Sequence, residues 1–111
     1  MNIWSLDKHK NLKLLLLMLD KQIGSKEFHF CRDENDDFMT VMLVKPAQSD
    51  IRAYVYTYGQ VENLYGIHLE YPWFIENGFN DSILVFENLT LQQVINSIAT
   101  HFDVASYEMV I

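Results

Sequence analysis

The spacing of apolar residues changes along the chain, and each change predicts a different kind of element. Between Ser5 and Gly24 apolar residues recur every three or four positions, which predicts a helix that Ser5 caps and Gly24 ends. From Glu27 onward the period becomes two, which is typical of strands. A second helical period follows Leu89. The order is therefore helix, strands, helix.

The first helix has an unusually wide apolar stripe. Its centre should be buried against the sheet, and three further residues widen it enough to pack on the C-terminal segment or on a second copy of the chain. The central residues are Leu12, Leu15, Leu16, Leu19 and Ile23, and the widening residues are Leu14, Leu17 and Met18. We expect the lysines to form the solvated side: Lys8, Lys10, Lys13 and Lys21.

Two hairpins and one more strand are predicted between the helices. The first hairpin pairs residues 28–32 with the apolar run 38–44 around the acidic turn 33–37. Because run 38–44 is apolar on both faces, it resembles a central, covered strand. A short fifth strand is expected at residues 82–86.

The second hairpin holds most of the tyrosines of the chain and has two unlike faces. Its turn is Gly59-Gln60, and alternation assigns one face to the core: Ile51, Ala53, Val55, Tyr65, Ile67 and Leu69. The opposite face places a tyrosine row beside polar residues of the second strand, and Gly66 leaves room for a ring. This face contains Arg52, Tyr54, Tyr56, Tyr58, Glu62, His68 and Glu70.

The last helix has the clearest local signal. Thr90 and Gln93 match a capping box, and Leu89 and Val94 are placed to form a hydrophobic staple across it. Its buried face would contain Val94, Ile95, Ile98, Ala99 and Phe102. Residues 103–111 could add a short edge strand or an extended tail.

We therefore predict one α+β domain over residues 1–111, an antiparallel sheet of about five strands with an N-terminal and a C-terminal helix packed on it. The strand order cannot be read from the sequence. The six apolar residues between Lys13 and Asp20 are far fewer than the roughly 20 that a membrane span needs. No secretory cleavage site follows them, so we expect a cytoplasmic protein.

Charge divides the chain into two halves. Residues 1–52 hold all eight basic residues and eight acids, whereas residues 53–111 hold seven acids and no base, so the whole net charge of −7 lies in the second half. A surface of one sign repels nucleic acid and anionic membranes and attracts a basic protein partner. Solubility alone would also account for the acidity.

Residue patterns for catalysis or metal binding are lacking. Cys31 and His29 lie two apart on a strand without an oxyanion site, and the four histidines do not have the spacing of a zinc motif. The run DENDD partly matches a calcium loop but has Phe38 where the loop needs glycine. We predict no cofactor, no metal and no enzymatic activity.

The hairpin YVYTYGQVENLYGIHLEYP and the base-free half ending in FENLTLQQVINSIATHF are similar in style to the small, acidic immunity proteins of bacterial contact-dependent growth inhibition and related polymorphic toxin systems. That resemblance implies an inhibitor of a cognate toxin domain, often a basic nuclease. The predicted partner-binding residues are the three tyrosines of the row and four polar residues around them: Tyr54, Tyr56, Tyr58, Glu62, His68, Glu70 and Glu76. The alternative is a homo-oligomeric structural or adaptor domain that associates through the wide first helix or the loop at Trp73 and Phe74; a small enzyme is a third interpretation.

Overall fold

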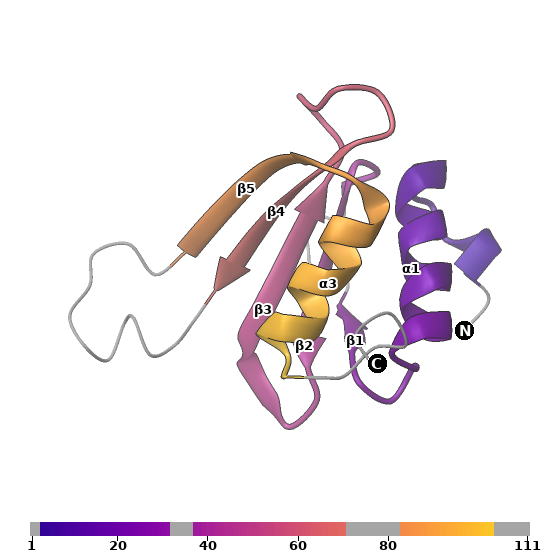
Figure 1. The fold of residues 1–111 in the computed structure, drawn as a ribbon. Coiled ribbons are helices and arrows are strands. Elements are labelled where there is room, and N and C mark those ends of the chain that lie inside the picture. Colours follow the sequence, from indigo (N-terminus) through magenta and orange to yellow (C-terminus); the bar gives the residue numbers. More distant parts are fainter. Residues whose placement is uncertain (1–2, 32–36, 71–82, 104–111) are drawn as a thin grey trace.

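The computed structural model describes residues 3–31, 37–70 and 83–103 and confirms the α+β arrangement (Figure 1). Five antiparallel strands form one sheet in the order β1-β2-β3-β4-β5, so each strand pairs with its neighbour in the chain. The helical elements are η1 (Ile3–Ser5), α1 (Lys10–Gln22) and α3 (Leu91–His101). The strands are β1 (His29–Cys31), β2 (Thr40–Lys45), β3 (Gln48–Tyr56), β4 (Tyr65–Glu70) and β5 (Ile83–Leu89).

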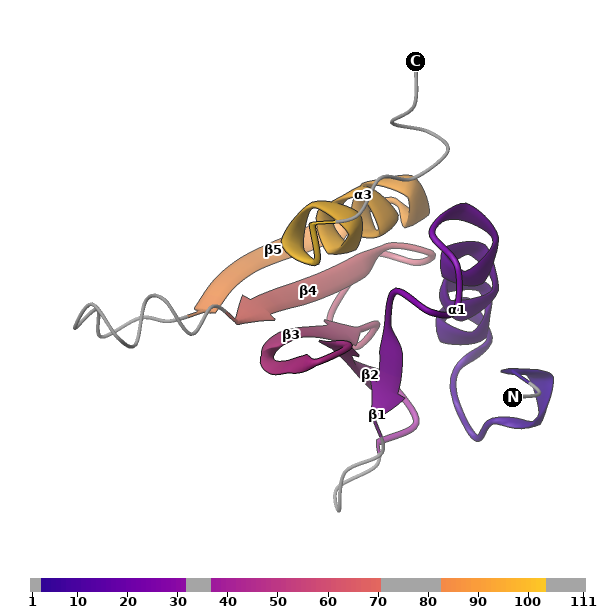
Figure 2. The ribbon, with the colours of Figure 1, turned by 90° about the horizontal axis from the view of Figure 1, so that it is seen from below.

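Both long helices lie against the same face of the sheet, with α3 over β3 and β4 and α1 beside α3 at the β1 end (Figures 1 and 2). One hydrophobic core joins the two helices to this face. From the second hairpin the face contributes residues that alternation assigned to the core, namely Ala53, Val55, Tyr65, Ile67 and Leu69, while the predicted Ile51 is partly buried against it. From β2 it contributes Val41 and Leu43. The opposite face of β3 and β4 therefore carries the residues in between.

The start of α1 differs from the prediction that Ser5 caps it. Ser5 belongs to η1, and the cap is His9, whose side chain accepts a hydrogen bond from the Asn11 amide. A tertiary contact explains the later start, because the His9 amide donates to the Phe38 carbonyl oxygen at 2.9 Å. At the other end Gly24, with φ of +94°, follows the helix as expected.

Lys8 also differs from its predicted place on a solvated helix face. Its side chain is only 5% exposed, and Nζ donates to the Asp37 carbonyl oxygen at 2.6 Å. The aliphatic part of a lysine packs well against apolar surface while its ammonium group finds an acceptor. Lys8 thus fastens the segment before α1 to the segment that leads into β2.

The local signals for α3 are confirmed. Thr90 and Gln93 form the complete capping box, and all five residues of the predicted buried face are buried. Leu89, on the other side of the cap, packs against the same core as Val94. The apolar face and the cap together fix where this helix begins and which side it buries.

Several predicted boundaries shift. β4 begins at Tyr65, so Glu62 lies in the loop between β3 and β4 instead of in the strand. β5 continues to Leu89, three residues beyond its predicted end. Most of the acidic turn, the loop at Trp73 and Phe74, and the C-terminal residues after Asp103 lie outside the described residues.

Candidate interaction surface

The candidate site lies on the sheet face opposite the helices, and we call it the aromatic face. It is formed by Arg52, Tyr54, Tyr56, Tyr58, His68, Glu70 and Glu87. Cross-strand pairing sets its rows, because Arg52 is opposite Glu70, Tyr54 is opposite His68 and Tyr56 is opposite Gly66. Within residues 3–31, 37–70 and 83–103, no helix packs on this face (Figure 2). The predicted tyrosine row beside His68 and Glu70 is therefore present.

The side chain of Tyr56 extends from β3 across the neighbouring strand β4. A Cβ atom at residue 66 would overlap with the ring and hydroxyl of Tyr56, so the ring occupies the space that a side chain there would fill. Beyond Gly66, the Tyr56 hydroxyl approaches Glu87 of β5, and the nearby carboxylate helps to raise its pKa. Glycine at residue 66 thus lets a tyrosine of β3 reach a carboxylate two strands away.

A β-bulge in β5 places that carboxylate. Tyr65 pairs with Leu89 and Ile67 pairs with Phe86, so the one residue between them on β4, Gly66, faces two residues of β5, Glu87 and Asn88. Asn88 lies in the extra stretch with φ of +54°, a left-handed conformation that asparagine tolerates better than most residues. Bulges redirect side chains, and this one brings Glu87 opposite the gap at Gly66.

The aromatic rings contact one another in a continuous group. Tyr58 stacks on Tyr56 with ring centroids 4.7 Å apart and planes tilted by 23°. His68 lies edge-on to Tyr56 at 5.1 Å and tilted against Tyr54 at 5.5 Å. Such ring pairs contribute beyond simple burial, and together they hold Tyr58 in one orientation.

Burial divides the three tyrosines into different roles. Tyr56 is 3% exposed, whereas Tyr58 is 46% exposed and Tyr54 is half-buried. Tyr56 therefore offers almost no area to a partner, and it supports Tyr58 from below. Burial raises the pKa of Tyr56, and the neighbouring Glu87 raises it further. The hydroxyl of Tyr56 therefore stays neutral beside the carboxylate.

Tyr54 is held in the same manner at the other side of the row. Burial is the main cause that raises its pKa, and a side-chain hydrogen bond with Tyr58 is the second. The neighbouring Thr40 side chain has the opposite effect and lowers the pKa of Tyr54. The hydroxyl groups of the row are thus engaged with one another and with neighbouring strands.

Gln60 fastens the loop between β3 and β4 to the bulge. Its Nε2 donates to Glu87, and its Oε1 accepts from the Asn88 amide at 2.6 Å. The Val61 amide in turn donates to Asn88 Oδ1 at 2.8 Å. These bonds satisfy polar groups at the bulge and fix the loop that carries Tyr58.

A shallow hollow of about 370 Å³ opens between this loop and the strands. Two tyrosine rings, an imidazole, a carboxylate and two side-chain amides line it: Tyr56, Tyr58, Gln60, His68, Glu87 and Asn88, with Gly59 at the rim. Among these residues the one formal charge is the negative charge of Glu87.

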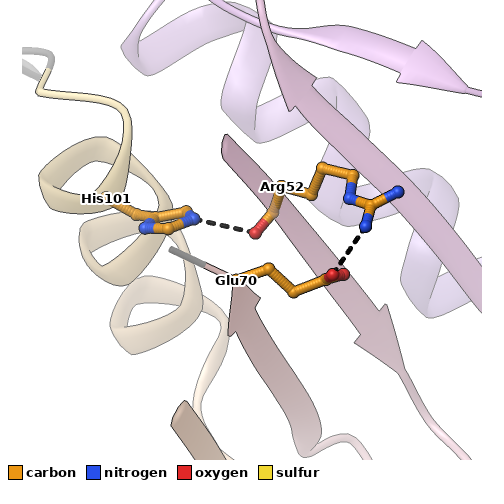
Figure 3. Close-up of polar contacts among 3 residues, drawn as sticks. All are labelled: Arg52, Glu70 and His101. Atoms are coloured by element: carbon orange, nitrogen blue, oxygen red, sulfur yellow. Dashed lines mark hydrogen bonds and ion pairs between the residues drawn. The ribbon is translucent and has the colours of Figure 1, made fainter. Parts of the chain in front are cut away.

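At the other end of the aromatic face, Arg52 and Glu70 form an ion pair across β3 and β4, with Nη2 and Oε1 2.8 Å apart (Figure 3). Behind it, on the helix side, His101 Nε2 lies 2.7 Å from the Arg52 carbonyl oxygen. A carbonyl oxygen only accepts, so Nε2 carries the proton and donates. Burial lowers the pKa of His101, although Glu70 and the bond to the Arg52 backbone oppose that shift.

Of the remaining predicted site residues, Glu62 does not join the aromatic face. Glu62 is exposed in the loop and lines a separate hollow of about 240 Å³ together with His9, Asn11 and Asn63. Glu76 lies outside the described residues. No group of three or more His, Cys, Asp or Glu side chains in the described part of the chain could hold a metal ion.

Sequence reasoning missed the part that Glu87 plays on this face. The residue stands in a strand whose pairing is unreadable from the sequence, and its position depends on the bulge at Asn88. The available signal was the glycine between Tyr65 and Ile67, which indicates space for a ring on the neighbouring strand.

Comparisons of the chain with protein-family models, with curated proteins and with solved structures found no match. In the ranges that the structure describes, no helix has the length and apolar character needed to cross a membrane. We therefore infer function from the chemistry of the aromatic face.

Proposed function

We propose that this protein is a cytoplasmic immunity protein that binds a cognate basic toxin domain, a nuclease, and neutralises it through the aromatic face. The observation that carries the proposal is the exposed Tyr58, which is stacked on a buried tyrosine and lies beside a carboxylate. The partner-binding set is Tyr54, Tyr58, His68, Glu70 and Glu87, with Tyr56 as its support.

Preorganisation favours a binding role for this surface. An exposed tyrosine buries a large area in an interface, and one that is already ordered loses little entropy on binding. Tyr58 is stacked on Tyr56 and carried by a loop that Gln60 fastens to β5. Because little entropy is lost, contacts with a few side chains of the partner are enough to give affinity.

Charge favours a basic partner. Between Ala53 and Asp103 the described residues include four carboxylates and no lysine or arginine: Glu62, Glu70, Glu87 and Asp103. The cations of α1 lie on the other side of the sheet (Figure 2). On the aromatic face itself Arg52 is paired with Glu70, so the remaining formal charge is that of Glu87. The negative field of this carboxylate steers a cationic active site toward the face and speeds association at low ionic strength. Nucleic acid and anionic membranes are repelled by the same field.

The test uses the toxin-like domain encoded immediately upstream of this gene. Adding the protein should abolish the nuclease activity of that domain at a one-to-one ratio, and added salt should slow association. Glu87→Lys should weaken inhibition at least tenfold, whereas Asp20→Lys, an equal charge reversal at an exposed position of α1, should leave it within about twofold. An upstream gene without a toxin-like domain, or equal effects of the two reversals, would contradict the proposal.

A homo-oligomeric structural or adaptor domain is the second candidate. Three consecutive apolar residues of β5 are exposed, namely Leu84, Val85 and Phe86, and β5 is an edge of the sheet as far as the described strands extend. Exposed apolar edges pair readily with other strands. Leu14 adds an exposed apolar residue on α1. Sedimentation at increasing protein concentration tests this candidate, and a monomer throughout would exclude it.

A further inference from the structure

We infer that the hollow between Tyr58 and Glu87 is a subsite for a guanidinium group, an arginine side chain that the partner inserts. This inference rests on the proposed function and makes it specific, because it names the group that the aromatic face recognises. The hollow, lined by Tyr56, Tyr58, His68 and Glu87, has a volume of about 370 Å³, compared with the roughly 30 Å³ that one water molecule occupies in the liquid.

The residues that line the hollow offer two kinds of interaction, stacking on an aromatic ring and pairing with a carboxylate, and a guanidinium group can make both. Aromatic faces attract a cation through their quadrupole, and the flat guanidinium group also stacks on rings. Tyr58, 46% exposed and stacked on the buried Tyr56, offers such a ring, and Glu87 offers the counter-charge beside it. A carboxylate also accepts paired N–H donors from arginine.

Glu87 retains acceptor capacity for this contact. A carboxylate has roughly four acceptor positions, and among the described residues Gln60 Nε2 donates to one of them. This donor holds the carboxylate in place without neutralising it. The described structure assigns it no ion pair with lysine or arginine, in contrast to Glu70, which is paired with Arg52.

The lining favours arginine over lysine and over neutral groups. Further hydrogen-bond acceptors around Glu87 come from the side-chain amides of Gln60 and Asn88, and the five N–H donors of a guanidinium group use more acceptors than the three of an ammonium group. An ammonium group also keeps its water more strongly. A neutral urea of the same shape would lose the charge-assisted bond to Glu87.

Three blocked amino acids provide the probes: N-acetyl-arginine methylamide, the lysine equivalent and the uncharged citrulline equivalent, which has nearly the same shape as arginine. Titration at pH 8, followed by NMR of the aromatic rings, should show saturable shifts of Tyr58 and His68 with arginine at a Kd on the order of tens of millimolar. Lysine should bind several-fold more weakly, and citrulline should not saturate. Equal behaviour of arginine and citrulline would overturn the inference.

Two variants test whether the arginine probe binds in the hollow. Glu87→Gln, a change at an exposed position, should reduce arginine affinity at least fivefold, and Tyr58→Leu should remove the ring shifts of His68. Asp20→Asn is the matched control and should change nothing. Unchanged arginine binding in folded Glu87→Gln would overturn the inference. If the probes do not bind while the protein still inhibits the toxin, the guanidinium subsite is wrong and the proposed function stands. If arginine binds but the protein does not inhibit the toxin, the proposed function is wrong and the guanidinium subsite stands.

Discussion

Tyr56 of β3 lies over Gly66 of β4, and its hydroxyl lies near enough to Glu87 of β5 for the carboxylate to raise its pKa, on the face that no described helix covers. The geometry requires glycine at residue 66, because any side chain there would displace the ring. Tyr58 stacks on that ring, and the exposed part of the aromatic face therefore depends on a residue that has no side chain.

Gly66→Ala should lower the free energy of unfolding by about 1–3 kcal/mol, the usual cost of overpacking. The physical cause is the overlap of the new methyl group with the Tyr56 ring. Urea unfolding measures the loss. In a Tyr56→Ala background the same glycine change should cost clearly less, since the overlap is gone. Equal costs in both backgrounds would show that the two residues are not coupled.

Stability should fall as the pH rises above about 10, the pKa of tyrosine in the unfolded chain. Burial raises the pKa of Tyr65 to about 12, and its hydroxyl donates to the Asn11 carbonyl oxygen at 2.8 Å. Because the folded state keeps this proton while the unfolded state releases it, stability from Tyr65 is complete below pH 10 and is lost between about pH 10 and 12. Tyr65→Phe should flatten the slope of unfolding free energy against pH in that window. A slope equal to that of the wild type would contradict this role.

Stability should also fall as the pH drops below about 6.5, the pKa of histidine in the unfolded chain. The folded pKa of His101 is lowered by burial, so the unfolded chain takes up a proton first and folding loses free energy from pH 6.5 downward. His101→Gln keeps an N–H donor for the Arg52 carbonyl oxygen and should remove this dependence between pH 7 and 5. Thermal unfolding across that range checks it, and an unchanged slope would exclude His101 as its source.

The ion pair of Arg52 and Glu70 should contribute little to stability. Both side chains reach solvent, with 46% and 22% exposed, and exposed ion pairs typically contribute less than about 1 kcal/mol. A double-mutant cycle with Arg52→Ala and Glu70→Ala should give a coupling energy below that value, smaller still in 1 M salt. A coupling energy above about 2 kcal/mol would mean that the pair is a structural element of the sheet.

Signals that act over a few residues made much of the fold predictable. The capping box at Thr90 and Gln93 and the glycine after α1 each fix a boundary through neighbouring atoms, and both are confirmed. Alternation in the second hairpin assigned Ala53, Val55 and Ile67 to the core for the same reason. Period and capping are properties of a short stretch of chain, so a sequence reveals them directly.

Features that depend on distant contacts were not predictable. The start of α1 is set by bonds from Lys8 and His9 to the segment before β2, about 29 residues away in the chain. The place of Glu87 is set by a bulge whose register only strand pairing defines. The tyrosine row and its neighbours Arg52, His68 and Glu70 were thus visible in the sequence, and the carboxylate of Glu87 that completes the surface required the structure.

The most direct measurement of the central claim compares two exposed aromatic side chains. Tyr58 and Phe38 are 46% and 48% exposed, but only Tyr58 belongs to the aromatic face. In calorimetric titrations with the toxin domain that the proposed function requires, Tyr58→Ala should raise the Kd at least tenfold, about 1.4 kcal/mol, and Phe38→Ala should leave it within about twofold. A larger loss from Phe38→Ala, or no loss from Tyr58→Ala, would contradict binding through the aromatic face.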